Sequence, residues 1–295
     1  MKRRVEEVTF LSDGLKISGA LHFPDGADSG RPAVVKLHGF GGTKDSGGSP
    51  RMCEYFASLG DVALRFDFRG CGKSEGHPAL ILCDDAVTDA RNALTYLAGR
   101  AEVDPNRMAL VGQSYGAAVA VAAGSLDERA AAVISIAGWG NGERKFRRQH
   151  AEPEAWSKFE AMMAEGRRRR NVGERLMVPR YDIVPIPEHL RGNMANDGHH
   201  MDFPWEVAES IWNFRAEDVV SRLAPRPLLL IHAARDSVTP ANESIELFLH
   251  AGEPAELHVL EDIDHFALSD EAPRLTSLVQ GWLARYFPAH LTETV

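Results

Sequence analysis

The chain has 295 residues and a formal net charge of −9 at pH 7, with 44% hydrophobic and 25% charged residues. These values suit one folded α/β core with room for an insertion, and they exclude a disordered or fibrous protein. The acidic charge argues against a nucleic-acid partner, and no apolar run reaches the length of a membrane span. We therefore expect a small-molecule partner.

The N-terminal residues and the cysteines indicate the expected compartment. Basic residues at positions 2–4 are followed by mixed polar and apolar residues, not by the apolar stretch of a signal peptide. Cys53, Cys71 and Cys83 are odd in number and lack the paired spacing of a metal site, which favours reduced thiols. Both features predict a cytoplasmic protein.

Short apolar runs alternate with helical patterns along most of the chain. Residues 5–11 and 15–23 flank a Ser-Asp-Gly turn and predict a hairpin at a sheet edge. Strands that alternate with helices predict an α/β fold with a doubly wound, mostly parallel sheet. Strands are expected at residues 33–37, 62–66, 108–111, 130–137, 228–233 and 255–260, a turn at 104–106, and helices at 50–59, 84–99, 275–287 and after the turn at 112–116.

The strongest chemical signal is a Gly-x-Ser-x-Gly sequence at residues 112–116, centred on Ser114. An apolar run precedes it and an alanine-rich helix pattern follows, which is the context of a nucleophile elbow. Side chains at Gly112 and Gly116 would collide in such a sharp turn, whereas glycines allow it. The bare pattern also fits an unreactive serine in a tight turn, but the flanking strand and helix favour a nucleophile.

Two later loops supply partners for the serine. Asp236 and His265 each follow a predicted strand, and the order Ser114, Asp236, His265 is the chain order of a catalytic triad in this kind of fold. Asp262 and Asp264 compete for the role of the acid. They lie so close in sequence to His265 that we interpret them as residues that shape the loop.

A glycine-rich turn at residues 38–42 follows the predicted strand 33–37. A hydrolase needs a backbone NH at this place for its oxyanion hole, and we predict the NH groups of Phe40 and Tyr115 as the two donors. The alternative is a flexible loop with an incidental histidine. His38 is expected to form structural hydrogen bonds rather than to act as a base.

The alternation of strands and helices breaks after residue 138 and resumes near residue 219. Polar helical patterns, prolines and many aromatic residues fill the interval. We interpret residues 139–218 as an inserted lid domain, and residues 1–138 and 219–295 as the core domain that carries it.

The aromatic and basic residues of the insertion each have two interpretations. Trp139, Trp205 and Trp212 are candidates to line a pocket for an apolar or aromatic substrate group, or else they form the small core of the insertion. The arginine run at residues 167–170 is typical of a solvated helix face. Attraction of an anionic substrate, or of a second copy in a homo-oligomer, is the alternative.

Two patterns imitate cofactor sites, and we reject both. His199, His200 and Asp202 are potential metal ligands, but adjacent histidines on an unpatterned loop rarely converge on one ion. Residues 69–74 resemble a phosphate-binding loop but lack its first glycine at the required distance. We predict neither a metal nor another cofactor.

Taken together, these motifs resemble the α/β-hydrolase superfamily over nearly the whole chain. Within it, the turn that begins at His38 and the loop at 65–76 are similar to cinnamoyl or feruloyl esterases and to serine aminopeptidase-like hydrolases. The resemblance implies a lid and an acyl-enzyme mechanism. The chain departs from it at Gln113, where histidine is common, and in its longer lid.

The predicted reaction is hydrolysis of a carboxylic ester, in which His265 deprotonates Ser114. A triad does not choose between ester and amide substrates, so a serine peptidase or amidase is the nearest alternative. That alternative needs a carboxylate that binds the substrate amine, for which Glu143, Asp197 and Asp202 are available. The same fold also hosts acyl transfer, hydrolysis of a carbon-carbon bond, and ligand binding without catalysis.

Overall fold

The computed structural model describes residues 4–26, 29–192, 194, 198–261, 263–266 and 273–287. In this part of the chain, eight strands form one sheet in the order β1-β2-β4-β3-β5-β6-β9-β10. They are β1 (Val5–Ser12), β2 (Leu15–His22), β3 (Arg31–Leu37), β4 (Val62–Phe66), β5 (Val103–Gln113), β6 (Ala130–Ile136), β9 (Leu228–Ala233) and β10 (Ala255–Leu260).

The sheet is parallel from β4 through to β10, whereas β1 and β2 form an antiparallel hairpin that joins β4. This confirms the prediction of a mostly parallel α/β fold with an edge hairpin. The interior strands β4 and β9 are buried along their whole length. Helices on both faces explain their mostly apolar sequences.

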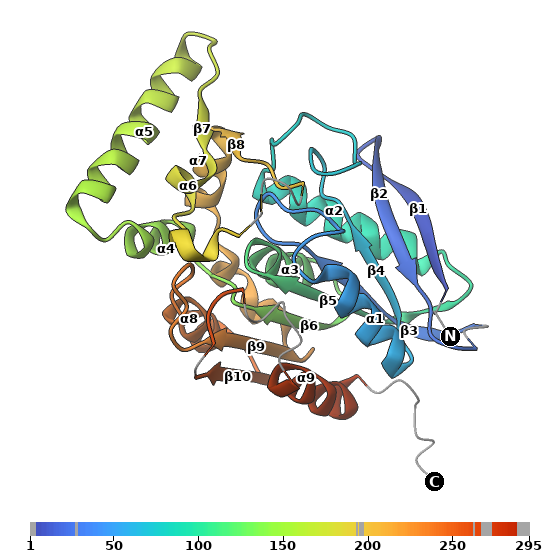
Figure 1. Cartoon of the computed structure of the whole chain (residues 1–295). Helices are drawn as coiled ribbons and strands as arrows, with labels where there is room; N and C mark the ends of the chain where they lie inside the picture. The colour runs from blue at the N-terminus through green and yellow to red at the C-terminus, as the bar shows by residue number, and fades with distance from the viewer. Residues whose placement is uncertain are drawn as a thin grey trace.

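The helices of the core pack on two faces of the sheet (Figure 1). One hydrophobic cluster contains side chains of α2, α3 and α8, and a second contains side chains of α1 and α9 on the opposite face. These helices are α1 (Ser49–Leu59), α2 (Cys83–Ala98), α3 (Tyr115–Leu126), α8 (Asn242–His250) and α9 (Pro273–Tyr286).

Strand β5 is longer than its sequence pattern predicts. The expected turn at 104–106 lies within the strand, because Val103 already pairs with Arg31 of β3. The next pair is Met108 with Ala33, so the register shifts and the residues between them bulge from the ladder. Pro105 has no NH to donate to a ladder, which fits a bulge at this point.

The sequence between β6 and β9 forms a helical segment with a small antiparallel sheet. In Figure 1, α5 lies at its outer side, and α7 contacts both α5 and the core helix α2. Its elements are α4 (Gly142–Gln149), α5 (Pro153–Asn171), β7 (Met177–Pro179), α6 (Arg180–Ile183), η1 (Glu188–Leu190), β8 (Asp202–Pro204) and α7 (Glu206–Asn213), followed by η2 (Ala216–Asp218) and η3 (Val220–Leu223).

Buried charges tie this segment to the core. Glu243 of α8 is fully buried and accepts hydrogen bonds from Arg144 at 2.9 Å and from Arg148 at 2.7 Å. Arg144 also donates to Glu217 at 2.7 Å. Removing one partner of such a group leaves an uncompensated buried charge, so these bonds fix α4 against α8.

None of the described helices combines the length and the apolarity that crossing a membrane requires.

A glycine in α5 permits close packing within the segment. A Cβ on Gly166 would lie 2.2 Å from the Trp205 ring, whereas a Cβ on Gly281 of α9 would meet no atom within 4 Å. We expect Gly166→Ala to lower the free energy of unfolding by about 1–3 kcal/mol through overpacking. Gly281→Ala, the matched control, should raise it by up to about 1 kcal/mol through helix propensity. Urea denaturation measures both, and stabilisation by both variants would contradict the packing argument.

Candidate active site

The turn between β5 and α3 holds Ser114 in an unusual backbone conformation, with φ 55° and ψ −117°. A Cβ on Gly112 would lie 1.9 Å from the carbonyl oxygen of Gly116, and one on Gly116 would lie 2.6 Å from that of His38. The chain can therefore make this turn only with glycine at both positions. The turn carries the Ser114 hydroxyl into a cavity at the end of the sheet.

His265 connects the serine to a buried carboxylate. Its Nε2 lies 3.0 Å from Oγ of Ser114, and its Nδ1 lies 2.8 Å from Oδ2 of Asp236. The His265 side chain is 3% exposed and that of Asp236 is fully buried. An imidazole placed in this way can accept a proton at Nε2 while the carboxylate fixes its orientation through Nδ1.

Asp236 is stabilised as an anion despite its burial. Burial alone raises its pKa, but the charges and hydrogen bonds of His265 and His232 lower the pKa overall. Its Oδ1 also accepts hydrogen bonds from the NH groups of Val238 at 2.9 Å and Thr239 at 2.7 Å. Hydrogen bonds to the charged form favour ionisation, so Asp236 remains a carboxylate.

His232 is a site neighbour that the sequence reasoning missed. It is fully buried in β9, its Nε2 lies 3.4 Å from Oδ2 of Asp236, and its Nδ1 lies 2.6 Å from Oγ of Ser244. The only sequence signal was a single histidine in an otherwise apolar strand. His232 therefore contacts the same carboxylate oxygen of Asp236 that His265 contacts.

Asp264 joins the two loops instead of contacting the imidazole. It accepts hydrogen bonds from the NH of Ser237 at 2.8 Å, from the hydroxyl of Ser237 at 2.7 Å and from the NH of His265 at 2.6 Å. This agrees with its predicted role in shaping the loop. Asp262, the other competing acid, lies outside the described residues.

The glycine-rich turn after β3 lies beside Ser114, because β3 and β5 are neighbours in the sheet. Gly41 has φ +57°, and a Cβ there would lie 2.5 Å from the Phe203 ring. The ring of Phe40 stacks on that of Phe203, with centroids 4.4 Å apart. His38 accepts a hydrogen bond from the NH of Phe68 at 3.2 Å, as expected for a structural histidine.

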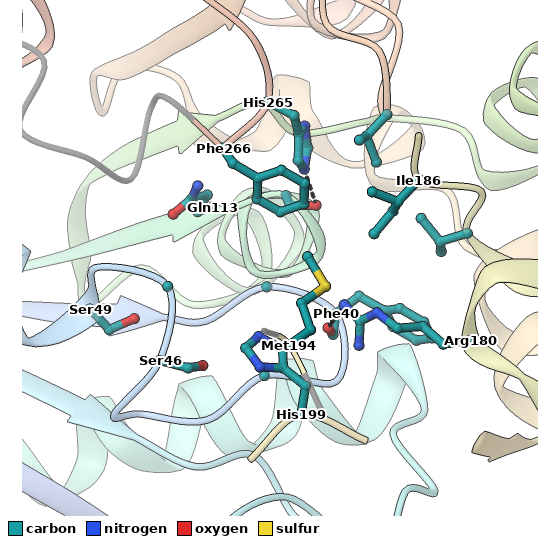
Figure 2. A pocket seen from close by; sticks show the side chains of 16 residues that line it. Phe40, Ser46, Ser49, Gln113, Arg180, Ile186, Met194, His199, His265 and Phe266 are labelled. Carbon is teal, nitrogen blue, oxygen red and sulfur yellow. Dashed lines mark hydrogen bonds between the residues drawn. The ribbon is translucent and has the colours of Figure 1, made fainter. Parts of the chain in front are cut away.

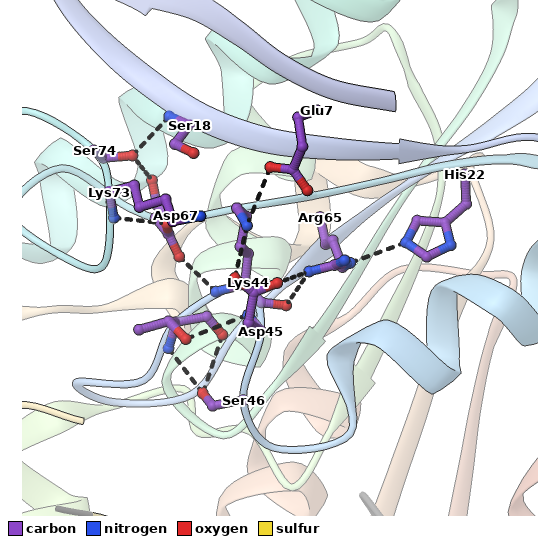
Figure 3. A network of polar contacts seen from close by, with 11 residues as sticks. Glu7, Ser18, His22, Lys44, Asp45, Ser46, Arg65, Asp67, Lys73 and Ser74 are labelled. Atoms are coloured by element: carbon purple, nitrogen blue, oxygen red, sulfur yellow. Dashed lines mark hydrogen bonds and ion pairs between the residues drawn. The ribbon is translucent and has the colours of Figure 1, made fainter. Parts of the chain in front are cut away.

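A polar network holds the residues that directly follow this turn (Figure 3). The NH of Lys44 donates to Asp67 at 2.6 Å, and Asp67 also accepts from the NH of Lys73 at 2.9 Å. Nζ of Lys44 binds Asp45 at 2.7 Å and Glu7 at 3.5 Å. Asp67, in the loop after β4, thus fixes the segment that follows the turn after β3.

Ser114 and His265 line a cavity of about 60 Å³ (Figure 2). Side chains from the core and from the inserted segment share its wall. Its apolar side chains belong to Phe40, Val184, Ile186, Met194, Val238 and Phe266, and its other polar side chains belong to Ser46, Ser49, Gln113, Arg180 and His199. Among the described lining residues there is no aspartate or glutamate.

The three tryptophans predicted to line the pocket lie elsewhere. Trp139 and Trp205 are buried in the hydrophobic core, and Trp212 packs among the aromatic rings of α4 and α5. None of them lines the cavity that contains Ser114. This corrects the prediction in favour of its alternative, in which the tryptophans form the core of the insertion, because large flat side chains gain most from full burial there.

The arginines at 167–170 and His200 also bind other residues of the protein. Arg168 and Arg169 bind Glu165, while Arg167 and Arg170 bind Glu209. His200 contacts the carbonyl oxygen of Gly70 at 2.8 Å, whereas His199 lines the cavity. No group of three potential metal ligands occurs among the described residues.

The predicted oxyanion donors belong to two segments that lie next to the serine. Phe40 lines the cavity, and Tyr115 is the first residue of α3, directly after Ser114. NH groups at the start of a helix have no partner within it and are available to an anion. The side chain of Tyr115 is buried and donates to the carbonyl oxygen of Ile81 at 3.3 Å.

A family model described as serine aminopeptidase, S33, matches residues 28–272. The chain belongs to this family. Its fold is that of the α/β hydrolases, which confirms the superfamily resemblance in the sequence motifs. Members of this superfamily differ widely in substrate, so membership in the S33 family does not by itself decide which bond is cleaved.

Two relatives and two solved structures illustrate the range of similar chains. Thiohydrolase aneE of Aspergillus aculeatus is 26% identical to this S33-family chain over 288 residues, covering 90% of this chain and 88% of that protein. Polyketide transferase grgF of a Penicillium species is 28% identical over 271 residues, or 86% of each chain. The crystal structure of the α/β hydrolase GrgF from Penicillium sp. sh18 matches with a TM-score of 0.79 at 23% identity, covering 97% of this chain and 99% of that chain. Est1E of Butyrivibrio proteoclasticus, with ferulic acid bound, matches with a TM-score of 0.70 at 17% identity. The match covers 95% of this chain and 98% of that chain.

Because the pKa of Asp236 is lowered, the free energy of unfolding of this protein should depend on pH. Its pKa in the folded state lies below the ordinary value of 3.8, so ionised Asp236 stabilises the fold above about pH 4 and this contribution is lost as the pH falls further. We expect Asp236→Asn to lower the free energy of unfolding at pH 7 by about 1–3 kcal/mol. The deficit should shrink at pH 3, as measured by urea denaturation. A deficit that is constant between pH 7 and pH 3 would contradict a lowered pKa of Asp236 in the folded state.

Proposed function

We propose that this protein is a serine hydrolase that cleaves a carboxylic ester through an acyl-enzyme intermediate. The observation that supports the proposal is the unbroken chain of contacts from Oγ of Ser114 through His265 to Asp236, at 3.0 Å and 2.8 Å. Such a chain activates a hydroxyl that is otherwise a weak nucleophile at neutral pH. Membership in a family of hydrolases fits the same chemistry.

In the proposed reaction, Oγ of Ser114 attacks the ester carbonyl while Nε2 of His265 accepts its proton. Asp236 stabilises the imidazolium and keeps Nδ1 protonated. The NH groups of Phe40 and Tyr115 donate to the oxyanion, each contributing about 3 kcal/mol. His265 then protonates the leaving alcohol, and a water molecule deprotonated by His265 hydrolyses the acyl-enzyme.

We assign residues 139–218 the role of a cap over this reaction. Arg180, Ile186 and Met194 from this segment line the same cavity as Ser114. A cap of this kind excludes bulk water and contacts the substrate next to the reacting bond. The small, largely apolar cavity suits a compact acyl group, and the proposal requires no metal or other cofactor.

An aminopeptidase reaction is less well supported than ester hydrolysis. Binding of a free substrate amine calls for a carboxylate in the pocket, and the described lining residues include none. Glu143, one of the candidates, is bound by Arg147 and Arg215. Asp202 lies on β8 and does not line the cavity, and Asp197 lies outside the described residues.

The serine assignment has a direct test. We expect Ser114→Ala to lower kcat for p-nitrophenyl butyrate by at least about 10⁴-fold, because the nucleophile is lost, and to abolish labelling by a fluorophosphonate probe. Ser49→Ala is the matched control, since Ser49 lines the same cavity at the start of α1. It should keep both labelling and most activity. Normal turnover by Ser114→Ala would refute the proposal.

Acyl transfer is a second candidate, supported by the similarity to a fungal polyketide transferase. The same acyl-enzyme can react with an alcohol or a thiol in place of water. With p-nitrophenyl butyrate and an added primary alcohol, we expect the free acid to be the main product by chromatography. A new ester that dominates while the alcohol is far more dilute than water would instead identify a transferase.

A further inference from the structure

A buried cation lies in the wall of the cavity. Arg180 begins α6, is 4% exposed and faces the cavity beside Phe40 (Figure 2). Its Nη2 donates to the carbonyl oxygen of Phe40 at 2.6 Å, and its Nη1 donates to that of His200 at 3.2 Å. A guanidinium has five N–H donors, so three remain after these two bonds. Nε is one of them, and it has no partner among the described residues.

No carboxylate neutralises this guanidinium in the described part of the chain. Both hydrogen bonds from its Nη atoms go to neutral carbonyl oxygens, and the ionisable groups that interact with it, Tyr181 and Cys71, are a phenol and a thiol. Burial lowers the pKa of Arg180 to about 10, so it stays protonated at neutral pH. A buried cation of this kind is costly unless an anion pairs with it.

Other arginines of the inserted segment have such anions. Arg144 binds Glu217 and Glu243, and Arg148 also binds Glu243. Arg180 is more deeply buried than either of them and lacks a carboxylate partner among the described residues. Its place in the wall of the cavity with Ser114 indicates that the missing anion comes with the ligand.

We propose that Arg180 binds a carboxylate on the acyl part of the substrate, a few bonds from the ester that Ser114 attacks. This inference rests on the proposed function, since it takes the cavity as the place where the ester binds. The preferred substrates are then half-esters of short dicarboxylic acids. Val184 and Ile186 also line this cavity and contact the short carbon chain between the two carboxyl carbons. The N–H groups of Arg180 that are not bonded to Phe40 and His200 hold the carboxylate oxygens.

Arg180 has a second role that the test must separate from anion binding. Its bond to the carbonyl oxygen of Phe40 also holds the turn whose NH is a proposed oxyanion donor. Loss of this bond impairs every ester alike, whereas loss of anion binding impairs only substrates that carry the carboxylate. Two esters that differ only in this charge therefore distinguish the roles.

The kinetic test compares mono-p-nitrophenyl glutarate with its neutral analogue, p-nitrophenyl methyl glutarate. We expect the wild-type protein to prefer the charged ester in kcat/KM by about tenfold to a hundredfold, mainly through KM. Arg180→Met should abolish this preference, and Arg180→Lys should restore part of it. Arg170→Met, which removes an exposed arginine bound to Glu209, is the control and should keep the full preference.

Two results would overturn the proposal. One is a wild-type protein with no preference for the charged ester. The other is an Arg180→Met protein with an unchanged melting temperature whose activity falls equally on both esters, which assigns Arg180 to holding Phe40 alone. If Arg180→Met does not fold, the comparison of Arg180→Lys with the wild-type protein decides.

A binding measurement separates this inference from the proposed function. In the Ser114→Ala background, calorimetry should show that monomethyl glutarate binds at least about tenfold more tightly than dimethyl glutarate, and that Arg180→Met removes the difference. Equal binding of both compounds overturns the anion site even if the enzyme hydrolyses esters. Arg180-dependent binding without ester hydrolysis by the wild-type protein refutes the proposed function and keeps the anion site.

Discussion

The site depends on one strained residue, Ser114, held at φ 55° between β5 and α3. Such a conformation costs about 1–3 kcal/mol and persists only where the surroundings enforce it. The NH of Ser114 donates to the carbonyl oxygen of Ile136 at 2.9 Å, and nearly every residue of α3 is buried against the sheet. Gly112 and Gly116 remove the Cβ atoms that would prevent this packing. The strain is thus offset by the core and serves to expose the hydroxyl.

The order of strands brings the partners to that hydroxyl. β3 and β5 are neighbours, so the turn with Phe40 lies beside Ser114. β9 and β10 are neighbours further along, so the loops with Asp236 and His265 converge as well. In a parallel sheet, all of these loops leave from the same edge, which is where ligands bind in open α/β folds. His232 and the loop-bridging Asp264 then fix the histidine and its acid.

The charge of the cavity wall is the reason why we propose ester hydrolysis rather than the aminopeptidase reaction named in the family's description. A pocket that takes up a free amine needs an anion, but the charged side chain in the described wall without an acidic partner is Arg180. The same guanidinium binds the carbonyl oxygen of Phe40, so the inserted segment both contacts the turn after β3 and places a positive charge in the cavity wall. In a small cavity inside the protein, such a charge is screened less than at the surface.

The sequence by itself determined the α/β fold and the residues Ser114, Asp236 and His265, because each follows an apolar strand in a turn with a local pattern. It did not determine the pocket. Trp205 was a plausible lining residue and is instead buried against Gly166, while Arg180 was not singled out and lines the cavity together with Ser114. Strand and turn signals are local, since they arise from spacing along the chain. Which side chains of the insertion meet the nucleophile depends on packing between residues far apart in sequence, and only the tertiary structure decides it.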